Sequence, residues 1–217
     1  MASSSFDDGS LAARVMDSCI CPTFAVRSTT GAKPDFLPRR CFSELATRDA
    51  IKEEMKPAFK LKPLKLRKDL IDFTELRAKK VFLTSLLVGL NPQLLVQFMK
   101  RCQKTGFDDT KLPVGKDCKT DGLDETFKNF NRVEKRNFYM HQWTFLAPEF
   151  ERGVYGYLFP PGTILPFFWQ DSIRVSGAFS DVFKVKIHKD HFKKAPLDVS
   201  LFRVVVHAIS VNCVKTY

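Results

Sequence analysis

The amino-acid sequence predicts an α+β fold in three consecutive parts: a disordered arm at 1–35, a helical region with a basic linker at 36–136, and a short antiparallel β region at 137–217. The arm is rich in Ser, Thr, Gly and Asp and shows no sustained periodicity. Apolar residues then recur at helical spacing, and beyond Asn137 aromatic residues, Pro, Gly and alternating apolar runs replace them.

Composition and charge limit the class of protein. A chain of 217 residues that is 44% hydrophobic and 12% aromatic is a globular protein of about one domain, which excludes collagen, a coiled coil and wholesale disorder. The net charge is +11, and residues 47–105 concentrate it, with 14 Lys and Arg against 6 Asp and Glu. A local excess of this kind indicates a partner more strongly than a diffuse one does.

Cysteine usage and targeting signals indicate the compartment. The 6 cysteines show no framework spacing and no signal peptide opens the chain, so a reduced intracellular location, cytoplasmic or nuclear, is expected. The longest apolar stretch, 81–90, is about half of the roughly 20 residues that cross a bilayer. No membrane partner is therefore expected.

The first helix is predicted just after the arm. Thr47 is a candidate N-cap, Asp49 favours the positive helix start, and Pro57 ends the helix because it excludes the helical conformation at the residue before it. A Lys/Pro linker is expected to follow at 56–68.

Two longer helices are predicted to form a hairpin. Asp72 and Glu75 have capping-box spacing and start the first, which Gly89 ends; Asn91–Pro92 starts the second, which Gly106 ends. The apolar residues at helical spacing are Phe73, Leu76, Leu83, Leu86, Leu87 and Leu90 in the first helix, and Leu94, Leu95, Phe98, Met99 and Cys102 in the second.

The hairpin and the linker are the candidate docking surfaces of the helical region. The helices at 72–104 present Leu and Phe faces, so a protein partner is expected there. The basic run at 52–68 can bind phosphate backbones, but no nucleic-acid fold signature accompanies it, and a solvated linker is the favoured interpretation. A loop at 108–122 and a third helix at 123–133 complete the helical region.

The β region begins with strand character at 139–146 and contains a turn at 160–162. Further strands are predicted at Ile173–Val175, Val182–His188 and Leu201–Ile209. The His188/His191 pair could ligate a metal, but a solvated turn beside Lys189, Asp190 and Lys193 is the favoured interpretation. The Cys19/Cys21 pair lacks a second pair at zinc spacing, so no metal site is predicted.

The tract from Val175 to Ile187 is the clearest candidate for a binding site. It combines a strand, a turn of small residues bearing one aromatic side chain, and a second strand that begins at Val182. This arrangement lets backbone N–H groups approach phosphates while the Val packs on an adenine ring. An ordinary hairpin turn of small residues is the commoner structure for such a fragment.

Three segments of a wider stretch form a further pattern: QWTFLAPEF at 142–150, ILPF at 164–167 and GAFSDVFKVKIHKDH at 177–191. This pattern resembles the entry into the kinase domain of a family of fungal protein-kinase-domain proteins. The resemblance covers about residues 36–192, and the family carries a helical segment upstream of its kinase fold. It implies that 173–176 is the first kinase strand and that 177–181 is the glycine-rich loop.

The chain departs from the family's pattern at several positions. Against the motif G-x-G-x-x-G-x-V, Val175 and Ser180 replace the first and third glycines, while Gly177 and Val182 fit. Ser210 stands where the strand lysine is expected, and a hydroxyl cannot pair with phosphate as a cation does. The sequence contains no H-R-D or D-F-G motif, whose carboxylates hold Mg²⁺ and accept the substrate proton.

The resemblance therefore implies a protein-kinase-like fragment of an ATP-binding Ser/Thr kinase family that is inactive alone. ATP is expected to bind weakly or not at all, and Mg²⁺ only with the missing catalytic half. A truncated product is favoured over a degenerate binding module, because a lone small lobe leaves a large face unpacked. The competing class is a non-enzymatic interaction protein. The implied nucleotide-binding residues are Val175, Ser176, Gly177, Ala178, Phe179, Ser180 and Val182.

Overall fold

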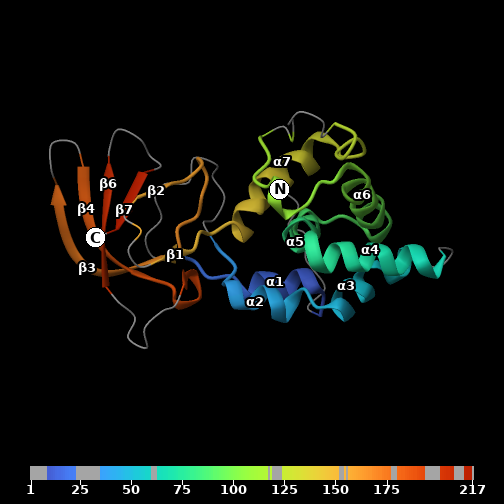
Figure 1. Ribbon diagram of the computed structural model, residues 1–217, viewed down its shortest axis with the longest axis horizontal. Coiled ribbons are helices and arrows are strands. Elements are labelled where there is room, and N and C mark those ends of the chain that lie inside the picture. Colours follow the sequence, from blue (N-terminus) through green and yellow to red (C-terminus); the bar gives the residue numbers. More distant parts are fainter. Residues whose placement is uncertain are drawn as a thin grey trace. The chain divides into compact units, whose positions relative to one another are not determined.

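A computed structural model describes the chain at 9–22, 35–59, 63–116, 118, 124–151, 154, 156–176, 180–193, 201–207 and 213–216. It divides into two compact units: a helical unit of Met1–Cys19 with Arg40–Phe145, and a β unit of Ile20–Arg39 with Leu146–Tyr217. The predicted α+β class is confirmed, with seven α-helices among the described residues (Figure 1).

The predicted arm contains a helix, so the prediction of disorder over 1–35 is wrong for this part. Helix α1 (Leu11–Ser18) is capped by Ser10, whose hydroxyl accepts from the Ala13 N–H at 3.2 Å. Its apolar residues Leu11, Ala12 and Val15 are buried. Eight residues are too few for a sustained periodic pattern. Arm residues 1–8 and 23–34 lie outside the described part.

The next helices follow the predicted caps. Helix α2 (Arg39–Leu45) precedes α3 (Arg48–Met55), and Thr47 caps α3 by accepting from the Ala50 N–H at 3.2 Å, as predicted. The 3₁₀ helix η1 (Lys56–Phe59) continues α3 directly. Ile51, Met55 and Phe59 are the buried residues that fix this segment in the helical unit.

The predicted helix start at Asp72 is wrong. Helix α4 (Leu64–Arg77) begins eight residues earlier, inside the predicted linker, and a break at Ala78 separates it from α5 (Lys79–Val88). Asp72 and Glu75 are not a capping box, because both accept from Arg48 of α3, at 2.5 and 2.8 Å. Leu76, predicted on the apolar face, is 79% exposed.

The cap of α5 comes from a distant part of the sequence. The carboxylate of Asp109, in η2 (Asp109–Lys111), accepts from the N–H groups of Lys80 and Val81, both at 3.0 Å. These contacts satisfy two of the N–H groups that a helix start leaves without partners. The break at Ala78 therefore has a long-range cause that local patterns do not contain.

The predicted hairpin is confirmed in α5 and α6 (Pro92–Thr105). Gly89 and Gly106 end these helices in the left-handed region, with φ of 84° and 71°. Asn91 caps α6 by accepting from the Leu94 N–H at 3.0 Å. The residues of the α6 apolar face that are buried are Leu95, Phe98, Met99 and Cys102.

The last helices occupy a different stretch from the predicted one. A helix was expected at 123–133 and a strand at 139–146; instead α7 (Arg132–His141) and η3 (Gln142–Phe145) span this part. Asn131 and Glu134 form a capping box for α7, a local signal that marks the true start. The helical part thus extends past the expected border at residue 136, to Phe145.

The β unit contains a five-stranded antiparallel sheet in the order β2-β7-β6-β4-β3. A two-stranded parallel pair, β1 (Phe150–Glu151) with β5 (Phe192–Lys193), accompanies it. The predicted strand at 173–175 falls in β3, and the one at 182–188 falls in β4 except for its last residue. The one at 201–209 corresponds to β6 over 201–207, and its last two residues lie outside the described part. The bounds of the sheet strands are β2 Tyr157–Leu158, β3 Phe167–Ser176, β4 Ser180–Ile187, β6 Leu201–His207 and β7 Cys213–Thr216.

The turn predicted at 160–162 is also present. The Thr163 N–H donates to the carbonyl of Pro160 at 3.2 Å, and Gly162 has a φ of 99°. A small apolar core lies at the end of the sheet where Phe167 pairs with Ile187. Its members are Phe150, Leu165, Phe167, Val185 and Ile187.

Candidate nucleotide-binding hairpin

Strands β3 and β4 form an antiparallel hairpin whose far end is the predicted binding tract. The pairing runs from Phe167 opposite Ile187 to Ser176 opposite Asp181. Val175 is paired with Val182, the two positions at which the kinase-like motif expects its first Gly and its Val. The register therefore brings together two of the predicted residues that are seven positions apart in the sequence.

The remaining predicted residues divide into two groups. Ser176 ends β3 and Ser180 begins β4, so both lie at the closed end of the hairpin. Gly177, Ala178 and Phe179 lie between these strands and outside the described residues. The structure thus gives a backbone position for four of the seven predicted residues.

The neighbouring strand adds positions that the sequence did not associate with this tract. Strand β6 pairs with β4 so that Val205 is opposite Val182 and Val206 is opposite Asp181. Val175, Val182 and Val205 therefore form one register row across three strands. The alternation at 201–209 predicted a strand, but no local signal identified its partner or its register.

An irregularity interrupts β3 halfway along the hairpin. Trp169 pairs with Val185, and the next pair is Arg174 with Phe183. Between these two pairs β3 advances by five residues while β4 advances by two. Bulges of this kind bend a strand and increase its twist. The bulge separates the binding tract from the end of the hairpin that packs in the core.

Aromatic residues pack at the open end of the hairpin, where Phe167 pairs with Ile187. Phe167 is fully buried, and its ring centroid lies 5.2 Å from that of Phe150 in β1. Phe150 also contacts Tyr157 and Phe159, at 5.0 and 6.0 Å between centroids. Aromatic pairs at these separations are favourable, so the base of the hairpin is well supported.

Phe36 packs against two histidines of the turn after β4. The Phe36 ring lies 5.6 Å from His188 and 5.1 Å from His191, edge to face. His191 is 2% exposed, and its Nδ1 lies 3.0 Å from the carbonyl oxygen of Pro148. Burial lowers the pKa of both imidazoles below the ordinary value, and the Pro148 carbonyl opposes this for His191.

The described residues contain no group of three or more His, Cys, Asp or Glu side chains placed to hold a metal ion. The expected solvated turn is wrong for His191, which is buried, packs against Phe36 and hydrogen-bonds to the backbone. Its role within the described contacts is to attach residues 35–37 to the β unit.

The apolar faces expected at 72–104 to meet a protein partner are largely used inside the helical unit. Phe73, Leu83, Leu86, Leu87 and Leu90 are all buried. Two leucines of α4 project into solvent instead: Leu64 is 81% exposed and Leu76 is 79% exposed. None of the described helices has the length and apolar character required to cross a bilayer.

Comparisons with models of known protein families, with curated proteins and with solved structures find no match for this chain.

Proposed function

We propose that the β unit is the front part of a protein-kinase-like small lobe and that its β3–β4 hairpin covers the phosphates and adenine of a nucleotide. The observation that carries the proposal is the register that pairs Val175 with Val182 around residues 177–179. In the kinase-like arrangement this Val packs on adenine, and the turn presents backbone N–H groups to phosphate.

The departures from the motif set the expected strength of binding. Ser180 and Val175 put side chains where glycines let the backbone approach phosphate. Ser210, outside the described residues, stands where the lysine is expected. We therefore expect ATP to bind with a dissociation constant of about 1 mM or weaker. Because the sequence contains no H-R-D or D-F-G motif, we expect no phosphotransfer by this chain alone.

Isothermal titration of the full chain with ATP and Mg²⁺ tests the proposal. Ser180→Gly restores the third glycine of the motif, so it should tighten ATP binding several-fold. Ser172→Gly, the same substitution in the irregular part of β3, is the matched control and should leave the affinity unchanged. Equal affinities for the two variants, or ATP turnover by the unmodified chain, would contradict the proposal.

The second candidate function is docking of a protein on the helices at 72–104, with no catalysis. The observation that favours it is the 79% exposure of Leu76 on α4. Nucleic acid at the basic run 52–68 is less favoured, because the buried Phe59 leaves no exposed aromatic ring in the described residues there to stack on bases. Loss of partner capture by Leu76→Ser, with unchanged folding, would support protein docking.

A further inference from the structure

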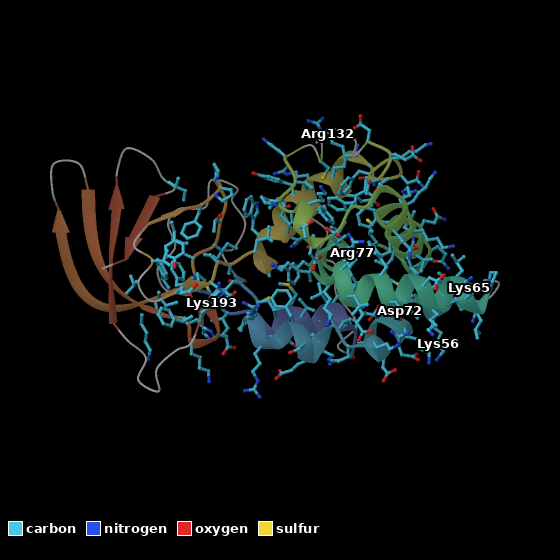
Figure 2. All side chains as sticks on the ribbon, in the orientation of Figure 1. Lys56, Lys65, Asp72, Arg77, Arg132 and Lys193 are labelled. Carbon is cyan, nitrogen blue, oxygen red and sulfur yellow. The ribbon has the colours of Figure 1, made fainter. Side chains whose placement is uncertain are left out.

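One end of the helical unit carries a cluster of cations around an exposed leucine, here named the basic tip: Lys56, Leu64, Lys65, Arg67 and Lys68. Its geometry follows from the antiparallel course of α3–η1 and α4. At one end of this pair Arg48 bonds to Asp72 and Glu75, and at the other the Arg67 guanidinium lies 6.0 Å from the Phe59 ring centroid. Figure 2 shows Lys56 and Lys65 at the same end of the unit.

Four side chains of the basic tip, those of Lys56, Leu64, Lys65 and Lys68, are exposed to solvent. Leu64 is 81% exposed, the Lys56 side chain is 68% exposed, and Lys65 and Lys68 are exposed as well. Glu53 pairs with Lys56 at 2.9 Å, but no ion pair to Lys65 or Lys68 occurs within the described part of the chain. The first turn of α4 contains no acidic residue and has no side-chain cap.

The charge at the start of α4 is opposite to the usual preference. Helix starts favour acidic side chains because the macrodipole is positive there, yet this one carries Lys65, Arg67 and Lys68. Leu64, beside them, is 81% exposed. Both features are unfavourable for an isolated unit in water, and both become favourable against an anionic surface with an apolar interior.

We infer that the basic tip docks onto the surface of an anionic lipid bilayer. Lysine side chains near such a surface are attracted to lipid phosphates and carboxylates, and their alkyl stems can lie along apolar groups. A leucine at the same place inserts into the boundary between headgroups and acyl chains. The inference goes beyond the nucleotide site, which lies in the other unit.

The chemistry of the tip favours lipid over nucleic acid. A duplex or single strand would attract the same cations, but the exposed apolar group here is Leu64, whereas Phe59 is only 5% exposed and covered by Arg67. Leucine gains nothing from base stacking and gains free energy on leaving water. The sequence-based expectation of no membrane partner considered spanning segments alone, and surface docking requires none.

Co-sedimentation of the full chain with vesicles of equal parts phosphatidylcholine and phosphatidylserine tests the charge requirement. Lys65→Glu with Lys68→Glu should lower the apparent affinity by about tenfold or more, because each cation contributes separately to attraction. Arg132→Glu with Arg136→Glu makes the same charge change on the exposed start of α7 and is the matched control, expected to lower affinity by no more than about twofold.

The apolar requirement is tested by a second pair of variants. Leu64→Ser should lower vesicle affinity by about tenfold, because it removes the inserted side chain. Leu76→Ser, equally exposed on the same helix, should change affinity by less than about twofold and also separates this site from protein docking at 72–104. Both positions are exposed, so neither variant should change the thermal melt.

Three results would overturn the inference. Equal binding to pure phosphatidylcholine vesicles would remove the requirement for anionic lipid. Equal losses of vesicle affinity in the two charge-reversal variants would show that the net charge of the chain, and not the basic tip, attracts it to the vesicles. Tighter, salt-sensitive binding of duplex RNA or DNA that Leu64→Ser leaves unchanged would assign the tip to nucleic acid.

Discussion

The helical and β units differ in the residues that form their described cores. In the helical unit, five buried phenylalanines form one cluster, with Phe98 4.7 Å from Phe130 and 5.3 Å from Phe127 between ring centroids. The other two members are Phe107 and Phe138. In the β unit, the apolar core among the described residues is Phe150, Leu165, Phe167, Val185 and Ile187, at the end of the β3–β4 hairpin where Phe167 pairs with Ile187.

The two units also satisfy polar groups differently. The buried amide of Gln142 accepts from the Val114 N–H at 2.7 Å and donates to the Val114 carbonyl at 2.9 Å, across 28 residues of sequence. In the β unit, strand pairing brings together segments that are far apart in the sequence, with β4 paired to both β3 and β6. The comparison teaches that a buried side chain joins distant segments of the helical unit, whereas backbone register joins those of the sheet.

The largest predicted effect is the loss of the phenylalanine cluster. Phe98→Ala should lower the free energy of unfolding by about 3–5 kcal/mol, because the ring is fully buried among three other phenylalanines. Urea denaturation followed by circular dichroism at the helical signal measures it. Val133→Ala, at a 65% exposed position, is the control, and a comparable loss there would contradict the account.

A smaller loss is expected from the distant cap of α5. Asp109→Ala should cost about 1–3 kcal/mol, because the N–H groups of Lys80 and Val81 lose their acceptor. Burial raises the pKa of this carboxyl, and the two N–H bonds oppose that shift. Amide hydrogen exchange at the start of α5 measures the effect locally; unchanged protection at Lys80 and Val81 would refute this cap.

The glycine that ends helix α6 gives a smaller expected loss of stability. Gly106→Ala should cost about 1–2 kcal/mol, since its φ of 71° lies in the left-handed region that disfavours a Cβ. Nothing lies within 4 Å of the added Cβ, so the cost comes from the backbone alone. Gly9→Ala, which also meets open space, should be nearly neutral in the same thermal unfolding experiment. Equal costs at the two positions would argue against this explanation.

The smallest predicted effect is a pH dependence of the β unit. Burial lowers the pKa of His188 and His191 below 6.5, so the unfolded chain binds protons that the folded unit does not. Their stabilising contribution is complete above pH 6.5 and is lost as the pH falls toward the lowered folded values. Asp190 opposes the shift of both histidines, and Lys189 adds to that of His188.

Denaturation at a series of pH values measures this effect. Replacing both histidines with Asn should flatten the acid side of the stability profile. Some slope should remain, because burial also lowers the pKa of His141 in the helical unit. A profile that is equally steep with and without the two histidines would contradict the assignment.

The residues explain which parts of the fold the sequence could predict. Thr47, Gly89, Asn91 and Gly106 act through contacts or backbone angles within a few residues, so their effects were visible locally. The break at Ala78 depends on Asp109, about thirty residues away, and could not be found from periodicity. Leu76 fits an apolar period but is exposed; the period was taken over one helix, whereas α4 ends at Arg77 and α5 is a separate helix.

The candidate site was predictable in part for the same reason. The two strands of the hairpin follow from alternation and from the small residues between them, which are local features. The pairing of Val182 with Val205 joins two strand residues that are 23 positions apart in the sequence, and no local pattern records it. The Asn131–Glu134 capping box is a local signal for the start of α7, but the many aromatic residues after it favoured a strand instead.

Backbone NMR of the full chain during titration with ATP and Mg²⁺ tests the central claim most directly. The account predicts saturable amide shifts concentrated at residues 175–182 and at Val205 and Val206 of β6, with helices α5 and α6 unchanged. The absence of shifts in the hairpin at ATP concentrations of about 10 mM, well above the expected dissociation constant, would contradict the proposed nucleotide site. Shifts confined to the helical unit would contradict it equally.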